Sequence, residues 1–274
     1  MKKLVLILFL FGCTKPDILP QEEITKFVEN QEVVGSPSTN VFDIDALGGL
    51  LFDNVNKFNN KPYGTLIVNK SNGHPVFDGE KSTRFEVRSG DCGWIETFSD
   101  CATDRSRSEL TELNATVETG KTVSYTERVY IPSQTRFKPQ GGNLLVLTQI
   151  RVNDTTQSTI SALAYLVMEN NNTLLIRTHR QFTWDWNKNY TITNTPYDKW
   201  IKIKYEVVAS EKSDGYIRVY VEDKLLFEEN RQTLVTKDSN LFFKFGIYNS
   251  FMKDAKESFG TQVVYFDGLE KKIK

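Results

Sequence analysis

Apolar and polar residues alternate along most of the chain after residue 80. Because successive side chains of a β-strand point to opposite faces, such period-two runs predict strands with one buried face. The runs cover residues 84–88, 122–131, 143–152, 160–168, 173–181, 200–209, 216–222, 241–248 and 262–266. Clusters of turn-forming residues separate several of them. Since no long amphipathic helix interrupts the series, the pattern predicts an all-β domain of two antiparallel sheets packed face to face.

Two neighbouring runs are characteristic in a further respect. A tryptophan opens the run 200–207, and the run 215–221 reads Gly-Tyr-Ile-Arg-Val-Tyr-Val before a tight turn at Glu222-Asp223-Lys224. This pair resembles the back-sheet strands of concanavalin-like β-jelly rolls. The resemblance implies a curved sandwich whose concave sheet forms a groove that fits a polymer.

The N-terminus has the layout of a bacterial export signal. Lys2 and Lys3 precede the uncharged segment 4–12, which is too short to span a bilayer as a permanent helix. Gly12 directly before Cys13, with Leu10 three positions ahead of the cysteine, matches a lipobox. We therefore expect a signal peptide at 1–12 and a lipid anchor at Cys13, with an ordinary export signal and an incidental cysteine as the alternative. The protein would then be an outer-membrane lipoprotein of the bacterial cell envelope, facing the periplasm or the surface.

The segment from 13 to 40 contains Pro16, Pro20 and Pro37 and little periodicity, so it predicts a tether between the lipid and one domain at 41–274. Once Cys13 is acylated, Cys92 and Cys101 remain as a pair in an oxidising compartment, which favours a disulfide. Free thiols or a metal pair are the alternatives.

The net charge and the number of histidines limit the kinds of ligand that the protein is expected to bind. The 34 basic and 35 acidic residues leave a net charge of −1, which gives no global field to attract nucleic acid or anionic lipid. His74 and His179 are the only histidines, and neither has a neighbour at metal-ligand spacing. We expect a monomer with no nucleic-acid partner and no metal site. Any affinity for an anionic ligand must come from locally gathered Lys and Arg.

Four segments place polar residues on one strand face where an ordinary core strand would be apolar. The groups that share a face are Arg105, Arg107 and Glu109; Gln149 and Arg151; Arg177, His179 and Gln181; and Lys244, Gly246 and Tyr248. An isolated group of this kind is most simply a solvated sheet face. The joint occurrence favours a groove that acts on carbohydrate.

Three of these segments, together with the stretch 84–92, carry a family resemblance. The stretches 84–92 and 101–110 and the pair Lys244 and Tyr248 resemble polysaccharide lyases of the heparin lyase type I and glucuronan lyase group. The motifs Arg-Ser-Glu-Leu, Gln-Ile and Lys-Phe-Gly-Ile-Tyr-Asn also resemble the three signature strands of jelly-roll alginate lyases. The resemblance covers the chain from about residue 80 to its C-terminus, with the motifs in the same order.

The resemblance implies β-elimination on a uronic-acid-containing polysaccharide. Such an enzyme neutralises the uronate carboxylate, removes the proton at C5 and expels the C4 oxygen. Tyr248 would be the base and acid, Lys244 would support its phenolate or hold substrate, and Arg107 and Gln149 would neutralise the carboxylate. Glu109 would orient Arg107. The remaining candidate substrate ligands are Arg105, Arg151, Arg177 and Asn249. No cofactor is required by this scheme, and whether calcium assists is left open.

One departure from the alginate lyase pattern matters. That pattern has a histidine two residues after the glutamine, where this chain has Arg151. Either His179, from a neighbouring strand, fills the role, or the site uses tyrosine alone and Arg151 is a further neutraliser. Trp184 and Trp186 could stack on sugars or cover the core. Substrate choice is expected to depend on loops such as 92–101 and 182–198.

Two other functions compete. A non-catalytic glycan-binding surface lipoprotein could use the same fold, because jelly rolls serve both purposes. A glycoside hydrolase of the laminarinase type would need two carboxylates around the glycosidic bond, and the chain lacks the strand Glu-x-Asp-x-x-Glu. The cluster of Tyr248, Gln149 and Arg107 favours the lyase, because a lectin has little reason to assemble it.

Overall fold

The computed structural model describes residues 41–43, 51–53, 61–95, 98–113, 115–134, 144–154, 159–169, 173–179, 186–250 and 260–274. The predicted signal peptide, the tether, Cys13, Gln181 and Trp184 lie outside these ranges. All described residues belong to one compact unit, which spans Glu32–Lys274. Within the described ranges, no helical segment combines the length and apolarity needed to cross a lipid bilayer.

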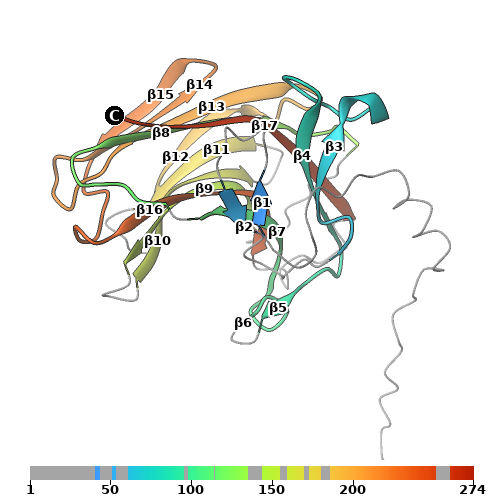
Figure 1. The fold of residues 1–274 in the computed structure, drawn as a ribbon, viewed down its shortest axis with the longest axis horizontal. Coiled ribbons are helices and arrows are strands. Elements are labelled where there is room, and N and C mark those ends of the chain that lie inside the picture. Colours follow the sequence, from blue (N-terminus) through green and yellow to red (C-terminus); the bar gives the residue numbers. More distant parts are fainter. Residues whose placement is uncertain are drawn as a thin grey trace, which may run out of the picture. The chain divides into compact units, whose positions relative to one another are not determined.

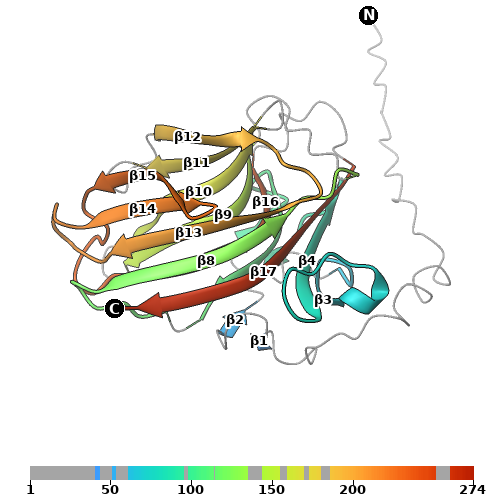
Figure 2. The ribbon, with the colours of Figure 1, turned by 90° about the horizontal axis from the view of Figure 1, so that it is seen from above.

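Two antiparallel sheets form the domain (Figure 1). In order across the first, here called the front sheet, lie β1 (Val41–Asp43), β2 (Leu51–Asp53), β7 (Arg105–Glu112), β16 (Asn240–Ser250), β9 (Leu144–Asp154), β10 (Thr159–Glu169), β11 (Thr173–His179) and β12 (Trp186–Asn194). In order across the second, the back sheet, lie β15 (Lys224–Asn230), β14 (Tyr216–Val221), β13 (Trp200–Val208), β8 (Thr122–Tyr130), β17 (Thr261–Ile273), β4 (Lys81–Arg88) and β3 (Thr65–Asn69). Figure 2 shows most of the back sheet in this order.

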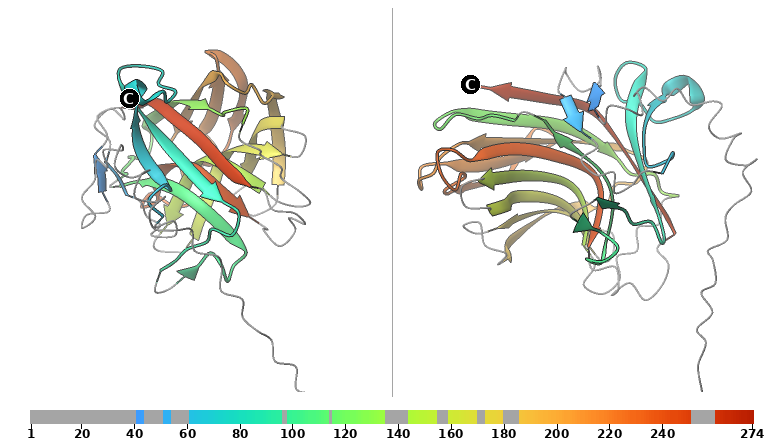
Figure 3. Two further views of the ribbon diagram at one scale, coloured as in Figure 1. Left: turned by 90° about the vertical axis from the view of Figure 1, so that its right-hand side faces the viewer. Right: turned by 60° about the horizontal axis from the view of Figure 1, so that its bottom comes forward.

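A third, small sheet and a short turn complete the described elements. The strands β5 (Trp94–Ile95) and β6 (Phe98–Ser99) form a hairpin that projects near β7. A 3-10 turn, η3 (Lys70–Asn72), follows β3. The strands of the front sheet bend along their length (Figure 3).

The core lies between the two sheets. Along β8 and β13, buried and partly exposed residues alternate without a break, as the sequence pattern predicts. The buried positions carry large side chains, and Tyr125 of β8 stacks on Phe243 of β16 at a centroid distance of 4.9 Å. Each fully buried Phe or Leu contributes about 1.5–3 kcal/mol. The face of the front sheet that points away from the core is therefore free to carry polar side chains.

Two carboxyl groups also lie between the sheets. Glu127 of β8 is 1% exposed and accepts hydrogen bonds from Thr148 at 2.8 Å and Tyr205 at 3.4 Å. Burial raises the pKa of Glu127 to about 8, although these hydrogen bonds oppose the shift. Glu112 of β7 accepts hydrogen bonds from Tyr125 at 2.7 Å and from Lys271 at 2.5 Å. Both groups are therefore satisfied within the core.

The predicted fold class is confirmed, and each predicted run contains or overlaps a strand. The tight turn at Glu222 and Asp223 is also confirmed, because both residues have positive φ between β14 and β15. The interpretation of 182–198 as a loop was wrong, since β12 occupies most of it. β15 escaped prediction because it is an edge strand with one buried side chain, Phe227, and no alternation.

Candidate functional site

The predicted polar residues meet on the outer face of the front sheet, which is the face turned away from the core. Lys244 of β16 lies opposite Gln149 of β9, and Gln149 lies opposite Tyr165 of β10. Tyr165 lies in turn opposite Arg177 of β11. Directly opposed residues of neighbouring strands point to the same side of a sheet. Segments separated by up to about a hundred residues thus form one row across four strands.

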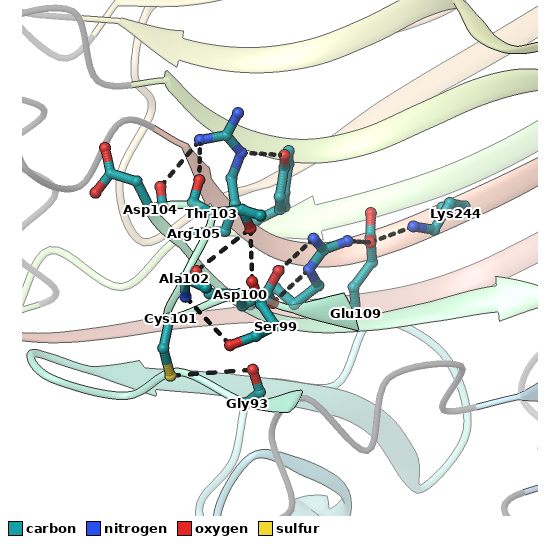
Figure 4. Close-up of polar contacts among 12 residues, drawn as sticks. Gly93, Ser99, Asp100, Cys101, Ala102, Thr103, Asp104, Arg105, Glu109 and Lys244 are labelled. Carbon is teal, nitrogen blue, oxygen red and sulfur yellow. Dashed lines mark hydrogen bonds and ion pairs between the residues drawn. The ribbon is translucent and has the colours of Figure 1, made fainter. Parts of the chain in front are cut away.

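A second row brings the predicted base to its predicted partner. Tyr248 of β16 lies opposite Arg107 of β7, and the guanidinium carbon of Arg107 lies 4.5 Å from the centre of the tyrosine ring. The neighbouring Arg105 donates a hydrogen bond from Nε to the phenol oxygen of Tyr248 at 2.9 Å. The carbonyl oxygens of Thr103 and Asp104 accept from Nη1 of Arg105, at 2.8 and 3.0 Å, and so hold its guanidinium in place (Figure 4).

Glu109 is the buried carboxylate at the centre of the site. It is 2% exposed and accepts hydrogen bonds from Nζ of Lys244 and from Nε2 of Gln149. The other end of that amide, Oε1 of Gln149, accepts a hydrogen bond from Arg151 at 2.9 Å. One chain of contacts therefore runs from Lys244 through Glu109 and Gln149 to Arg151.

The carboxylate that orients Arg107 is Asp100. Asp100 accepts from Nε of Arg107 at 2.7 Å and from Nη2 at 2.5 Å, whereas Glu109 lies 3.9 Å from Nη1. Burial disfavours the charged guanidinium, but the hydrogen bonds to Asp100 and the charge of Glu109 outweigh it and raise the pKa of Arg107. The sequence assigned the orientation of Arg107 to Glu109, whereas the closer contacts come from Asp100. Asp100 was missed because its only sequence signal is its place beside Cys101.

Lys244 is buried with its ammonium group inside this network. It is 7% exposed, and burial lowers the pKa of Lys244 to about 8, against the opposing charge of Glu109. The nearby charges of Arg107 and Arg151 lower it further. Lys244 therefore lies beneath the exposed part of the site and supports Glu109.

His179 and Arg177 lie toward the other edge of the front sheet. The imidazole of His179 is fully buried and packs edge-on against Tyr165, with 5.1 Å between ring centroids. Arg177 donates to Asn189 at 2.9 Å and forms an ion pair with Glu169, and burial lowers the pKa of Arg177. Tyr165, which the sequence did not single out, thus contacts His179 and belongs to the row that contains Gln149.

Asn249 does not belong to this face. It is fully buried and donates a hydrogen bond to Gln262 of the back sheet at 2.8 Å. Because side chains alternate along β16, Asn249 points into the sandwich where Tyr248 points out of it. The predicted role of Asn249 in substrate binding is therefore not supported by its position.

Arg84, Glu86 and Arg88 belong to the back sheet. Glu86 is 3% exposed and forms ion pairs with both arginines. The position of this stretch on β4 of the back sheet favours a structural role over a place at the substrate rim.

Gly246 provides room for the neighbouring strand. Its φ is +138°, and a Cβ atom there would come within 2.3 Å of the carbonyl oxygen of Ser108 and 2.8 Å of Cα of Glu109. The register between β16 and β9 also shifts between Phe245 and Tyr248. The glycine therefore allows a bulge that brings β16 close to β7 and sets the position of Tyr248.

The predicted disulfide between Cys92 and Cys101 is present, with 5.2 Å between the Cα atoms.

Trp184 lies outside the described residues, so its predicted sugar-stacking role stays a prediction. Over the part of the chain that the structure describes, no group of three or more His, Cys, Asp or Glu side chains is placed to hold a metal ion. That no cofactor is needed likewise stays a prediction.

The outer face carries more positive than negative charge. Among the residues whose side chains are described above, its cations are Arg105, Arg107, Arg151, Arg177 and Lys244, and its carboxylates are Asp100, Glu109 and Glu169. The partly exposed members are three arginines (Arg105, Arg107 and Arg151), Tyr248 and Glu169, whereas Gln149, Glu109 and Lys244 are buried. The face suits an anionic ligand.

Comparison with known proteins gives a family match. A family model described as polysaccharide lyase matches residues 65–270. A search of curated proteins found no match.

Several solved structures are similar to this one. Endo-β-1,4-glucuronan lyase from the fungus Trichoderma reesei has 19% identity and a TM-score of 0.56, with 80% of this chain and 89% of that chain covered. A variant of the family 7 alginate lyase A1-II′ in complex with substrate has 15% identity and a TM-score of 0.53, with 78% and 82% covered. Alginate lyase AlgAT5 of polysaccharide lyase family 7 has 16% identity and a TM-score of 0.50, with 73% and 81% covered. At these identities the likeness shows a shared jelly-roll fold.

Proposed function

The chain belongs to the polysaccharide lyase family, and we propose that it cleaves a uronic-acid-containing polysaccharide by β-elimination on the outer face of the front sheet. The observation that carries the proposal is the meeting of the Tyr248 phenol with the guanidinium groups of Arg105 and Arg107. The similar structures named as glucuronan lyase and alginate lyases support a uronate polymer as the substrate class.

The chemistry requires that a negative charge be neutralised before a proton is removed. The proton at C5 of a uronate lies next to a carboxylate, which opposes the carbanion that forms. Preorganised cations aimed at that carboxylate stabilise the enolate-like intermediate. Arg107 and Arg151 are partly exposed and flank the row that contains Gln149, so we assign them to the carboxylate.

Tyr248 is assigned as the base and the acid. Its oxygen takes the C5 proton, the electrons of that bond form a double bond between C4 and C5, and the bond from C4 to the glycosidic oxygen breaks. The leaving oxygen then takes a proton from the phenol. The form of Tyr248 that takes the proton is the phenolate, and because Arg105 donates to the phenol oxygen at 2.9 Å, a cation lies beside the negative charge of that form.

We assign neither His179 nor Gln149 to direct contact with the substrate. His179 is fully buried against Tyr165, whereas Tyr248 is partly exposed, which favours tyrosine alone as the base. Both ends of the Gln149 amide are occupied, by Glu109 and by Arg151, so we assign Gln149 to holding Arg151 over the face. Arg105 and Arg177 remain proposed substrate ligands. Because arginines supply the neutralising charge, the scheme needs no cofactor.

We also propose that the enzyme acts as a monomer tethered to the bacterial cell envelope through Cys13, which rests on the lipobox pattern of residues 10–13. The alternative of a non-catalytic glycan-binding lipoprotein has no support from the comparisons.

A polymer panel tests the proposal. A form starting after Cys13 is incubated with glucuronan, alginate, heparin-like chains and a neutral glucan, with and without a calcium chelator. We expect ultraviolet absorbance from a new conjugated double bond with at least one uronate polymer, none with the glucan, and no effect of the chelator. Reducing ends that appear without the absorbance would indicate hydrolysis and contradict the elimination.

A further inference from the structure

The disulfide closes the base of a hairpin that ends at Asp100. The strand pairs are Ile95 with Phe98 and Trp94 with Ser99. The next pair is Gly93 with Asp100, whose amide donates to the Gly93 carbonyl at 2.9 Å. Cys92 and Cys101 follow directly outside it. The covalent link therefore lies one residue from Asp100 on the chain.

Asp100 holds both arginines that contact Tyr248. Its side chain, 0% exposed, binds the guanidinium of Arg107 through two hydrogen bonds. Its backbone carbonyl accepts from the amide of Arg105 at 2.8 Å. A bidentate pair of this kind fixes the plane of the guanidinium as well as its position.

The segment after the disulfide holds the Arg105 side chain. The amide and hydroxyl of Thr103 donate to the carbonyl of Ser99 at 3.1 and 2.8 Å, which folds residues 99–103 into a tight loop. The carbonyl oxygens of Thr103 and Asp104 then accept from Arg105, whose Nε reaches Tyr248 (Figure 4). One stapled hairpin and its exit loop therefore place two cations around the phenol.

We propose that Asp100 is a positioning residue for the elimination and that the Cys92–Cys101 disulfide holds it in place, so that the activity is sensitive to thiols. The inference rests on the proposed function and extends it to control by redox state. A two-stranded hairpin is marginal on its own, so the hairpin depends on its staple. Both cysteines are exposed, so a small thiol reaches them.

Displacing a positioned group by about 1 Å can cost about a hundredfold in rate. Arg107 acts on charge that develops during the reaction, and loss of an interaction made only in the transition state lowers kcat more than it changes KM. Reduction of the disulfide should therefore act mainly on kcat.

The test compares kcat and KM of oxidised and thiol-reduced enzyme on the polymer that it cleaves best. We expect reduction to lower kcat roughly ten- to a hundredfold with little change in KM. The double variant Cys92→Ser/Cys101→Ser should have the low kcat without reductant and should not respond to thiol. Asp100→Asn should also have a low kcat, and reduction should lower it little further, because Arg107 has already lost the carboxylate that holds it through two hydrogen bonds.

Glu86→Gln is the matched control, since it breaks a buried acid–arginine cluster on the back sheet. Glu86→Gln should keep the full thiol response, and circular dichroism confirms folding of every variant. The inference is overturned if the oxidised enzyme cleaves polymer and its kcat does not change when thiol is added. It is also overturned if reduction lowers the kcat of Asp100→Asn by the same factor as it lowers the kcat of the wild type. Oxidised wild type without elimination activity on any uronate polymer would overturn the proposed function, and this inference with it.

Discussion

Tyr248 of β16 lies directly opposite Arg107 of β7, with the guanidinium carbon 4.5 Å from the centre of the phenol ring. These residues are 141 positions apart in the chain. They meet because β16 lies between β7 and β9 in the front sheet.

Tyr248→Phe should lower kcat by at least about a hundredfold, because it removes the group that transfers the proton. The change deletes one partly exposed hydroxyl, so the melting temperature should change little. Initial rates of double-bond formation and a thermal melt measure the two effects. Tyr130→Phe on the back sheet, which loses a 3.4 Å contact with Asp198, is the control and should keep full activity. Full activity of Tyr248→Phe would show that another group is the base.

Glu109→Gln should destabilise the fold by about 3 kcal/mol, since it leaves the buried Lys244 ammonium without its anion. The pKa of Lys244, already lowered to about 8, should fall further. Urea unfolding measures the change in free energy. Glu270→Gln, which breaks an exposed pair with Lys272, should stay within about 0.5 kcal/mol of the wild type. Equal effects of the two substitutions would contradict a role of burial.

Glu127 should make stability fall as the pH rises from about 5 to about 8. The pKa of Glu127 is about 8 in the folded chain, and its ordinary value, which applies to the unfolded chain, is 4.5. At pH values between these two, the folded state binds more protons than the unfolded state. The free energy of unfolding should then decrease by up to roughly 1.4 kcal/mol per pH unit. Glu127→Gln removes the titration. The unfolding free energy of the variant minus that of the wild type, measured across this range, should therefore rise with pH. A constant value would exclude the raised pKa.

Gly246→Ala should destabilise the protein by at least about 2 kcal/mol, because the added Cβ would clash with the Ser108 carbonyl at a positive φ. Thermal unfolding measures the loss. At Gly120, φ is +85° and nothing lies within 4 Å of a Cβ atom, so Gly120→Ala reports the backbone cost alone. If the two variants lose the same stability, the close approach of β7 to Gly246 has no energetic consequence.

Cys13→Ser should abolish incorporation of labelled fatty acid into the full chain expressed in a bacterium, because the thiol is the acylation site. The protein should also move from the membrane fraction to the soluble fraction. Cys92→Ser serves as the control for loss of an unrelated cysteine, and this variant should remain labelled. Labelling of Cys13→Ser would contradict the lipobox interpretation.

Alternation along the chain was enough to predict two antiparallel sheets, because each strand of a sandwich exposes one face to the core and one to solvent. It also predicted that Arg105, Arg107 and Glu109 share a face, and that Lys244 and Tyr248 do. Such relations are local, since neighbours two apart on a strand always point the same way. Edge strands such as β15 lack this signal, because neither face is fully buried.

The tertiary structure decided which residue contacts which. Asp100 lies in a loop with no periodicity, and only the disulfide-closed hairpin brings its carboxylate to Arg107. The tertiary structure also showed that Tyr248 is partly exposed and His179 is fully buried. The sequence did not give this difference, because exposure depends on packing across several strands. The residue types and their strand faces were written in the sequence, whereas the partners of each charge depended on strand order and register, which arise from contacts far apart in the chain.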